Sequence, residues 1–250
     1  MSIDMVADPH KLHFEKPDRS HLRSSRFFGG LLVVGLIASI IWGGMYLSNP
    51  DTFPIKQVRI EGDFTHLSPI DLQLLVTDKV RGGFFNLNVD AVRLALLNDP
   101  WVNEVTVKRI WPDALRVIVL EQVPVVRWGD SGLLNNEGKY FSPVKASIPI
   151  DLPKLTGPAD TEIMMLERFK VMQERVHAIG FNIASVTLDE RRAWSFKLDN
   201  GIKVILGRSN FEEHFNRFLN LIPTTISGRL DQTDSIDMRY TNGFSIKWKK

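Results

Sequence analysis

The chain has 250 residues, of which 44% are hydrophobic, and its 31 basic and 29 acidic side chains leave a net charge of +2. This balance gives no indication of nucleic-acid binding, and the absence of cysteine excludes disulfides, thiolate zinc sites and thiol nucleophiles. The length suits two compact domains, or one domain with appendages.

An uncharged apolar segment near the N-terminus predicts a membrane-spanning helix. It runs from Phe27 to Leu47, and a helix of this length, at about 1.5 Å per residue, spans a hydrocarbon core of about 30 Å. Three arginines precede this segment, namely Arg19, Arg23 and Arg26. The first basic residue after it is Lys56. The positive-inside rule therefore predicts a cytoplasmic tail over residues 1–26 and an extracytoplasmic region after residue 47.

A cleavable signal peptide is the alternative interpretation of this segment. The apolar stretch is longer than the core of a typical signal peptide, and residues 45–48 (Met-Tyr-Leu-Ser) contain no small-x-small cleavage site. We therefore expect the helix over residues 27–47 to remain as an anchor. Within it, Gly35, Ser39 and Gly43 recur every four residues. This spacing predicts close packing against a second transmembrane helix. The alternative is that it reflects the general frequency of these residues in membrane helices.

Residues 48–123 are predicted to form the first folded domain. Pro50 and Pro54 end any helix that continues from the membrane, and residues 55–62 then alternate apolar and polar side chains as a half-buried strand does. A helix is expected to start after Ser68, which would cap it, and to end before Gly82. Its expected apolar face consists of Ile70, Leu74 and Leu75.

The second half of this domain is predicted to contain one helix and two strands. The helix is expected from Val89 to Leu97, and its buried side chains are expected to be Val89, Val92, Leu96 and Leu97. Strands rich in β-branched residues follow at 102–110 and 115–122, joined by a turn around Pro112. The order strand, helix, helix, strand, strand is that of a POTRA domain.

Residues 124–250 are predicted to form a second domain of mostly antiparallel strands with flanking helices. Hairpins are expected around residues 136–138, 199–201 and 240–243, because each turn contains Asn and ends in Gly. Amphipathic helices are expected over residues 161–178 and 211–222, the first with an apolar face of Leu166, Phe169, Met172 and Val176. The fold class is therefore α+β, with a single transmembrane helix before the two domains.

No motif in the chain predicts catalysis, a cofactor or a bound metal. Ser131 lies in a Gly-Asp-Ser-Gly sequence of the kind found around serine nucleophiles, but a triad also requires a suitably presented histidine. The histidine upstream of it, His66, lies inside the predicted POTRA domain, so a polar turn explains these residues better. His10 and His13 lie in the polar tail without further ligands nearby, and we assign no metal to them.

The last predicted strand, residues 244–248, is the best candidate for binding another protein. A strand at the end of a chain often lies at a sheet edge, where unpaired backbone groups can accept a further strand. Alternation along it places Phe244, Ile246 and Trp248 on one side. Ordinary core packing is the alternative role for this row, whereas Tyr240 and Trp248, at the ends of the hairpin, are suited to anchor a partner.

The segment from Pro100 to Trp128 resembles the FtsQ/DivIB family of bacterial division proteins. The matching residues are Trp101-Val102, Arg109, Trp111-Pro112, Leu115, Glu121, Pro124 and Trp128. The resemblance extends to residues 155–158, 191–194 and 237–240, and to a single membrane helix near residue 30. It leaves out roughly the first twenty residues of the chain.

This resemblance implies a non-enzymatic division scaffold in the bacterial inner membrane, at the septum, with most of the chain in the periplasm. It further implies that the closing hairpin contacts FtsB, in a complex that also contains FtsL. The implied contact residues are Arg239, Tyr240, Asn242, Gly243 and Trp248, with Arg191 and Arg192 as further contributors and Phe244 added from the apolar row. The POTRA domain would help to recruit the chain to the division site.

Two other functions are compatible with parts of the sequence. A POTRA domain also occurs in secretion and outer-membrane assembly proteins, but there it usually comes in series ahead of a β-barrel. A membrane-tethered hydrolase would use Ser131, and its replacement by alanine would then abolish function. We expect the replacement Ser131→Ala to have no effect.

Overall fold

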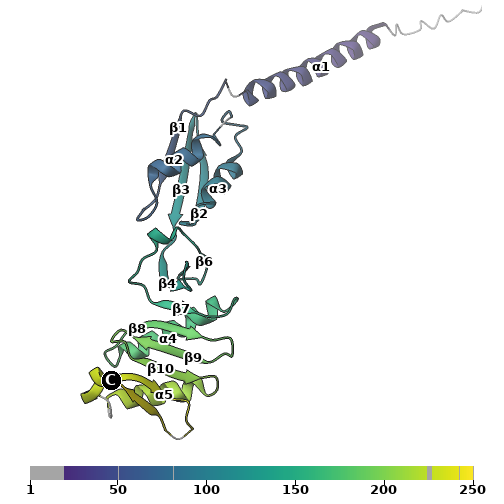
Figure 1. The fold of residues 1–250 in the computed structure, drawn as a ribbon. Coiled ribbons are helices and arrows are strands. Elements are labelled where there is room, and N and C mark those ends of the chain that lie inside the picture. Colours follow the sequence, from purple (N-terminus) through teal and green to yellow (C-terminus); the bar gives the residue numbers. More distant parts are fainter. Residues whose placement is uncertain (1–19, 50, 81, 224–226, 242, 250) are drawn as a thin grey trace, which may run out of the picture. The chain divides into compact units, whose positions relative to one another are not determined.

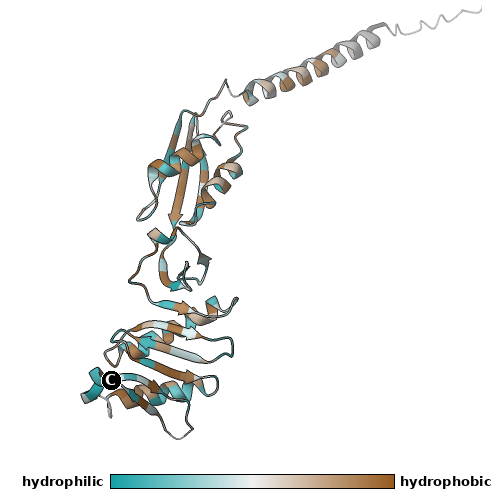
Figure 2. Cartoon of the chain, viewed as in Figure 1, coloured by the Kyte–Doolittle hydropathy of each residue, from teal (hydrophilic) through white to brown (hydrophobic). Residues whose placement is uncertain are grey.

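The computed structural model describes residues 20–49, 51–80, 82–223, 227–241 and 243–249 (Figure 1). Its first helix, α1 (Ser20–Ser48), includes the stretch Gly30–Ser48, which has a mean hydropathy of 2.0 and is long and apolar enough to cross a membrane. Figure 2 shows apolar colours along the described part of this helix. The small residues Gly35, Ser39 and Gly43 all lie on α1, and no atom of the described residues lies within 4 Å of a Cβ placed on either glycine.

A three-stranded sheet and two helices follow in the predicted POTRA order. The elements are β1 (Gln57–Glu61), α2 (Pro69–Thr77), α3 (Val89–Leu97), β2 (Val102–Ile110) and β3 (Ala114–Glu121). The strand order is β1-β3-β2, with β1 parallel and β2 antiparallel to β3. The sequence-based strands and helices of this region are therefore confirmed to within a few residues at their ends.

The buried face of α2 differs from the prediction. Leu72 and Val76 are 1% and 0% exposed and face the core, whereas Ile70 and Leu74 are 71% and 66% exposed. Leu75, the third predicted core residue, is 43% exposed. The prediction was wrong because α2 carries apolar residues around most of its circumference, so that periodicity alone cannot select the buried side.

The ends of the two helices are stabilised differently. Ser68 occupies the N-cap of α2 in an extended conformation, but within the described part of the chain its side chain makes no capping hydrogen bond. In α3, the side chain of Asn88 accepts a hydrogen bond from the N–H of Ala91 at 3.0 Å. The predicted core residues of α3 are confirmed, because Val92 and Leu96 are fully buried and Val89 and Leu97 pack against the same cluster.

The remaining strands form one nine-stranded sheet. They are β4 (Pro124–Trp128), β5 (Gly132–Asn135), β6 (Tyr140–Phe141), β7 (Lys154–Thr156), β8 (Ile183–Leu188), β9 (Trp194–Leu198), β10 (Lys203–Gly207), β11 (Thr233–Asp237) and β12 (Ser245–Trp248). Their order is β12-β11-β10-β9-β8-β7-β4-β5-β6. Most pairings are antiparallel, and the parallel ones are β4 with β7, β7 with β8 and β10 with β11.

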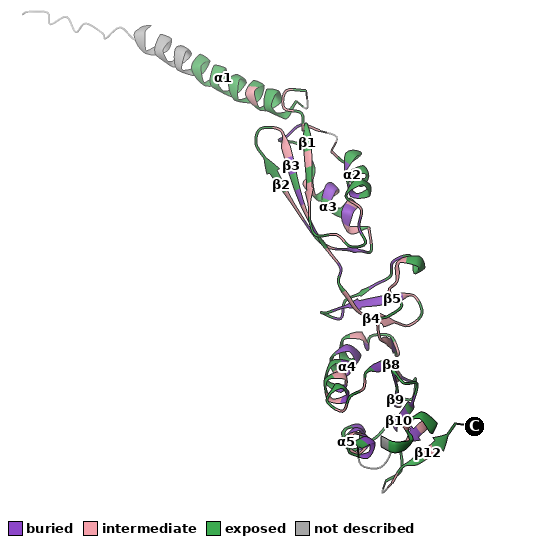
Figure 3. Cartoon of the chain, turned by 90° about the vertical axis from the view of Figure 1, so that its left-hand side faces the viewer, coloured by how far each residue is buried: buried purple, intermediate pink, exposed green. Residues whose placement is uncertain are grey.

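Two helices cover one side of this sheet. Figure 3 shows α4 (Glu162–His177) and α5 (Phe211–Leu221) on the same side of β8, β9 and β10. The predicted apolar face of α4 is confirmed, and Met165, which the sequence analysis did not include, is also fully buried. On α5 the buried aromatic residues are Phe211, Phe215 and Phe218, and they pack against strand residues such as Phe196.

The two sheets share part of a hydrophobic core. Leu133 of β5 and Phe141 of β6 belong to the cluster that is otherwise built from β1 to β3 and their helices. The indole of Trp101 joins them, because it stacks on His66 with ring centroids 3.7 Å apart and meets Phe141 edge-on at 5.4 Å. Trp101 also donates its indole N–H to the hydroxyl of Ser147 at 3.2 Å.

Candidate partner-binding strand

The last strand, β12, lies at the edge of the nine-stranded sheet. It pairs antiparallel with β11, with Ile246 opposite Ile236 and Ser245 opposite Asp237, and β11 has a register shift between Thr233 and Ser235. The last strand and a hairpin around residues 240–243 were predicted from the sequence, and the structure confirms the hairpin. Within the described residues, one side of β12 is therefore free of strand pairing.

The backbone groups that face away from β11 can be identified from one hydrogen bond. The N–H of Lys249 donates to the carbonyl of Gln232 at 2.7 Å, so Lys249 is directed toward the sheet. Because consecutive residues of a strand direct their N–H and C=O groups to opposite sides, those of Ile246 and Trp248 point outward. These are the groups that a further strand would bind.

The side chains of β12 divide between core and surface. Ile246 packs against the core cluster, as the alternative interpretation of the apolar row predicted. Trp248 and Phe244 are 42% and 38% exposed, and Tyr240, just before the turn, is 57% exposed. The guanidinium of Arg229 lies over the ring of Trp248 at 5.9 Å. The strand thus presents aromatic side chains at both of its ends.

A residue that the sequence analysis missed, Arg217 of α5, holds the turn between β11 and β12. One of its terminal nitrogens donates to the carbonyls of Tyr240 at 2.7 Å and Gly243 at 3.2 Å, and the other donates to the carbonyl of Thr241 at 3.0 Å. The second nitrogen also pairs with Glu213 one helical turn away at 2.6 Å. The four-residue spacing of Glu213 and Arg217 predicts an ion pair on the helix surface. It does not predict the hydrogen bonds from Arg217 to the turn between β11 and β12.

Arg239, two residues after β11, forms a two-pronged ion pair with the last residue of that strand. Its Nε and one terminal nitrogen donate to the two carboxylate oxygens of Asp237 at 2.9 and 2.6 Å. This hydrogen bonding outweighs the opposing effect of burial and lowers the pKa of Asp237. The side chain of Arg239 packs against Gly207, where a Cβ would lie 2.9 Å from the Cγ of Arg239 and clash with it.

The topology brings the other predicted arginines to the same end of the sheet. Arg191 and Arg192 lie in the turn between β8 and β9, where the Oδ1 of Asp189 accepts from the N–H groups of Arg191 and Ala193. β10 connects the two regions, because it pairs with the start of β9 at Gly207 and with the end of β11 at Ile205.

The predicted contact residues therefore fall into two groups. The turns that carry Arg191, Arg192, Arg239 and Tyr240 share one end of the sheet. Trp248, opposite Thr233, lies toward the other end of β12. Asn242, also predicted as a contact residue, lies outside the described residues, and its neighbour Gly243 is half-buried.

The residues of the serine-nucleophile motif lie in the turn between β4 and β5. Asp130 pairs there with Lys154 at 2.7 Å, and the carbonyl of Ser131 accepts a hydrogen bond from Ser142. His66 makes its contact elsewhere, with Glu121 at 2.8 Å. The polar-turn interpretation therefore accounts for the position and contacts of this motif.

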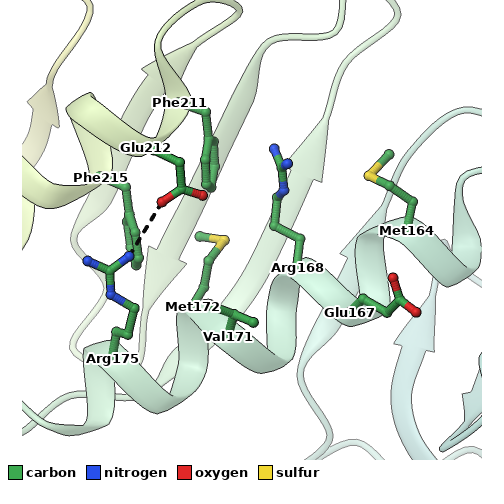
Figure 4. A pocket seen from close by; sticks show the side chains of 9 residues that line it. All are labelled: Met164, Glu167, Arg168, Val171, Met172, Arg175, Phe211, Glu212 and Phe215. Carbon is green, nitrogen blue, oxygen red and sulfur yellow. Dashed lines mark hydrogen bonds and ion pairs between the residues drawn. The ribbon is translucent and has the colours of Figure 1, made fainter.

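A pocket of about 300 Å³ lies between α4 and α5 (Figure 4). Its arginines stack on aromatic rings: Arg168 lies 4.4 Å from the ring centre of Phe211, and Arg175 lies 5.0 Å from that of Phe215. Arg175 also pairs with Glu212. These contacts hold the two helices together, and we assign no reaction to this pocket.

Comparison with known proteins matches both domains to one family. The model of the C-terminal region of cell division protein FtsQ/DivIB matches residues 126–239, and the model of the FtsQ-type POTRA domain matches residues 53–122. The cell division protein FtsQ of Coxiella burnetii is 36% identical over 87% of this chain and 90% of its own length. FtsQ of Methylomonas methanica is 32% identical over 83% and 84%, and FtsQ of Allochromatium vinosum is 33% identical over 86% and 88%. The chain belongs to the FtsQ/DivIB family of cell division proteins.

Proposed function

We propose that this chain is a non-enzymatic scaffold of the division machinery that binds FtsB, and together with it FtsL, by adding a strand of FtsB to β12. Membership of the FtsQ/DivIB family supports a role in cell division. The observation that carries the binding mechanism is the position of β12 at the sheet edge with the backbone groups of Ile246 and Trp248 directed outward.

The side chains around β12 would supply specificity. Tyr240, Phe244 and Trp248 are exposed aromatic residues of the kind that anchor interfaces. The arginines at one end of the sheet, Arg191, Arg192 and Arg239, suit acidic side chains on the partner. Asn242 and Gly243 belong to the same proposed surface, and residues 240–248 lie beyond the range that the family model matches.

The proposed placement has four parts. Residues 1–26 form a cytoplasmic tail, residues 27–47 cross the inner membrane, residues 48–123 form the POTRA domain and residues 124–250 the C-terminal domain. In this arrangement the chain links early and late division proteins at the septum from the periplasmic side. Gly35, Ser39 and Gly43 would pack against the transmembrane helix of a partner.

Capture of FtsB by the full-length chain tests this function. In detergent, immobilised FtsB should retain the wild-type chain, whereas the double variant Tyr240→Ala, Trp248→Ala should bind at least about tenfold more weakly, because loss of an interface anchor costs about 2 kcal/mol. Unchanged capture by a double variant whose circular dichroism matches that of the wild type would exclude this surface.

A matched pair of variants tests strand addition itself. Both Ile246→Ala and Ile246→Pro remove the partly buried side chain, but only proline also removes the outward N–H. We expect the alanine variant to keep most of its FtsB binding and the proline variant to lose it. Equal binding by the two folded variants would exclude main-chain pairing at this position.

A further inference from the structure

Two positive charges lie side by side where β4 meets β7. The register of this parallel pair places Arg127 opposite Lys154. Like charges at directly opposed positions of a sheet repel each other and destabilise it. A third cation, Lys145, lines the same pocket. It belongs to the 3-10 helix η1 (Lys145–Ser147), which follows β6.

The acidic residue among those that line the pocket is Asp130. Its carboxylate accepts a hydrogen bond from Lys154 at 2.7 Å, and its side chain is 91% exposed. Hydrogen bonding to Lys154, with a smaller contribution from the charge of Lys145, lowers the pKa of Asp130. Three positive charges and one negative charge leave the pocket with a net charge of +2.

The side chain of Arg127 includes a buried hydrogen-bond donor. Its Nε is buried and has no hydrogen-bond partner among the described residues. The backbone N–H of Arg127 donates a hydrogen bond to the carbonyl of Pro153 at 2.8 Å. The unsatisfied donor is therefore in the side chain and not in the backbone. A buried donor without an acceptor costs about 1–3 kcal/mol. Arg127 also lines the pocket, where a bound anion would bring negative charge close to this guanidinium.

The pocket has the size and lining of a site for a small molecule. Its volume is about 260 Å³, and besides the charged residues it is lined by the glycines of the β4–β5 turn and by Ile148 and Ile150. The isoleucines, of which Ile150 is 86% exposed, add apolar surface to the lining of the pocket.

We propose that this pocket binds the phosphate group of a small phosphate monoester. The charge of such a group, about −1.5 to −2 at pH 7, matches the net charge of the pocket, whereas a carboxylate would leave one positive charge unbalanced. Arg127, Lys145 and Lys154 donate hydrogen bonds to the phosphate oxygens. Asp130 competes with the ligand for Lys154.

Calorimetric titration of the detergent-solubilised full-length chain tests the proposal, with inorganic phosphate, glycerol 3-phosphate and acetate as probes at low ionic strength. We expect saturable binding of both phosphates and weaker binding of acetate. Tighter binding of glycerol 3-phosphate than of inorganic phosphate assigns the site to a phosphate ester, and the reverse assigns it to free phosphate. Equal affinity for acetate, or no saturable binding of either phosphate, would overturn the proposal.

Four variants localise the site. Arg127→Gln and Lys145→Gln should weaken phosphate binding by about tenfold or more, because each removes charged hydrogen-bond donors. Asp130→Asn should strengthen it by releasing Lys154. Arg168→Gln, in the pocket between α4 and α5, is the control and should bind as the wild type does. Because Lys145 is exposed, Lys145→Gln remains informative if Arg127→Gln fails to fold. Wild-type phosphate affinity in Lys145→Gln would contradict the assignment. Weaker phosphate binding by Asp130→Asn would contradict it too.

This site is separate from the proposed FtsB surface. The phosphate-pocket variants should therefore capture FtsB as the wild type does, and the variants of β12 should keep their phosphate affinity. The two proposals can thus fail independently of each other.

Discussion

Arg217 connects α5 to the turn that precedes the edge strand. It donates hydrogen bonds to the carbonyls of Tyr240, Thr241 and Gly243 while its ion pair with Glu213 fixes the side chain. No neighbour of Arg217 in sequence indicates this contact, because the turn lies more than twenty residues further along the chain. The residue matters to the proposed function because it fixes the start of β12.

Replacing Arg217 by Gln should loosen this turn and destabilise the protein by about 1–2 kcal/mol, since several charged hydrogen bonds are lost but the carbonyls can bind water instead. Urea unfolding gives the stability change, and faster amide exchange at residues 243–246 would report the loosened turn. Arg208→Gln is the control, because Arg208 is an exposed residue just after β10 and should change stability by less than about 0.5 kcal/mol. Equal effects of the two substitutions would contradict the role of Arg217.

Glu121 is the second residue whose contacts predict a measurable effect. Burial opposes its ionisation, but hydrogen bonds from His66 and from the backbone N–H groups of Thr65, His66 and Leu67 outweigh burial, so that its pKa is lowered. The carboxylate therefore ties the loop before α2 to the end of β3.

Because the pKa of Glu121 is lower in the folded chain, its contribution to stability is present above the unfolded-state value of about 4.3 and is lost as the pH falls through the folded-state value. Glu121→Gln should cost about 1–2 kcal/mol at pH 7 and clearly less at pH 3. Urea unfolding of both proteins at the two pH values measures this difference. A gap that is unchanged or wider at pH 3 would contradict the assignment.

At the scale of single elements, local sequence predicted where most helices and strands lie. Turns with Asn before Gly mark the hairpins at residues 199–201 and 240–243, and the helices α3, α4 and α5 carry one apolar face that periodicity identifies. α2 is the exception, because its apolar residues surround the helix. Packing against the sheet, rather than the pattern, decides that Leu72 and Val76 are buried.

The two leucines of α2 give a direct test of this orientation. Leu72→Ala should destabilise the protein by about 2–4 kcal/mol through loss of buried contacts and the cavity left behind. Leu74→Ala removes the same atoms from an exposed position and should change stability by less than about 0.5 kcal/mol. Urea midpoints of the two variants provide the comparison. A larger loss from Leu74→Ala would restore the face that the sequence analysis predicted.

For the whole molecule, the apolar helix determines which side of the membrane the folded domains occupy. The three arginines before residue 27 and the scarcity of basic residues after residue 47 predict that both domains lie outside the cytoplasm. The proposed binding of FtsB to β12 assumes that the C-terminal domain is on that side. The orientation is therefore a condition of the proposed function.

Reporters fused after residue 250 test the orientation. Alkaline phosphatase, which is active only outside the cytoplasm, should be active in this fusion, and β-galactosidase should be inactive. Substituting Glu for Arg19, Arg23 and Arg26 should reduce phosphatase activity, because the positive flank directs insertion. An active β-galactosidase fusion of the unaltered chain would contradict both the orientation and the proposed contact with FtsB.

The sequence by itself determined the apolar helix, the order of the elements in the POTRA domain and the hairpins, because each depends on residues that are close along the chain. It also carried the resemblance to the FtsQ/DivIB family, which the family models confirm. Only the tertiary structure decided which side of α2 is buried, that β7 lies between β4 and β8, and that Arg217 holds the turn before β12. These features depend on contacts between residues far apart in sequence, such as Arg127 and Lys154, whose adjacency arises from strand pairing and not from any local pattern.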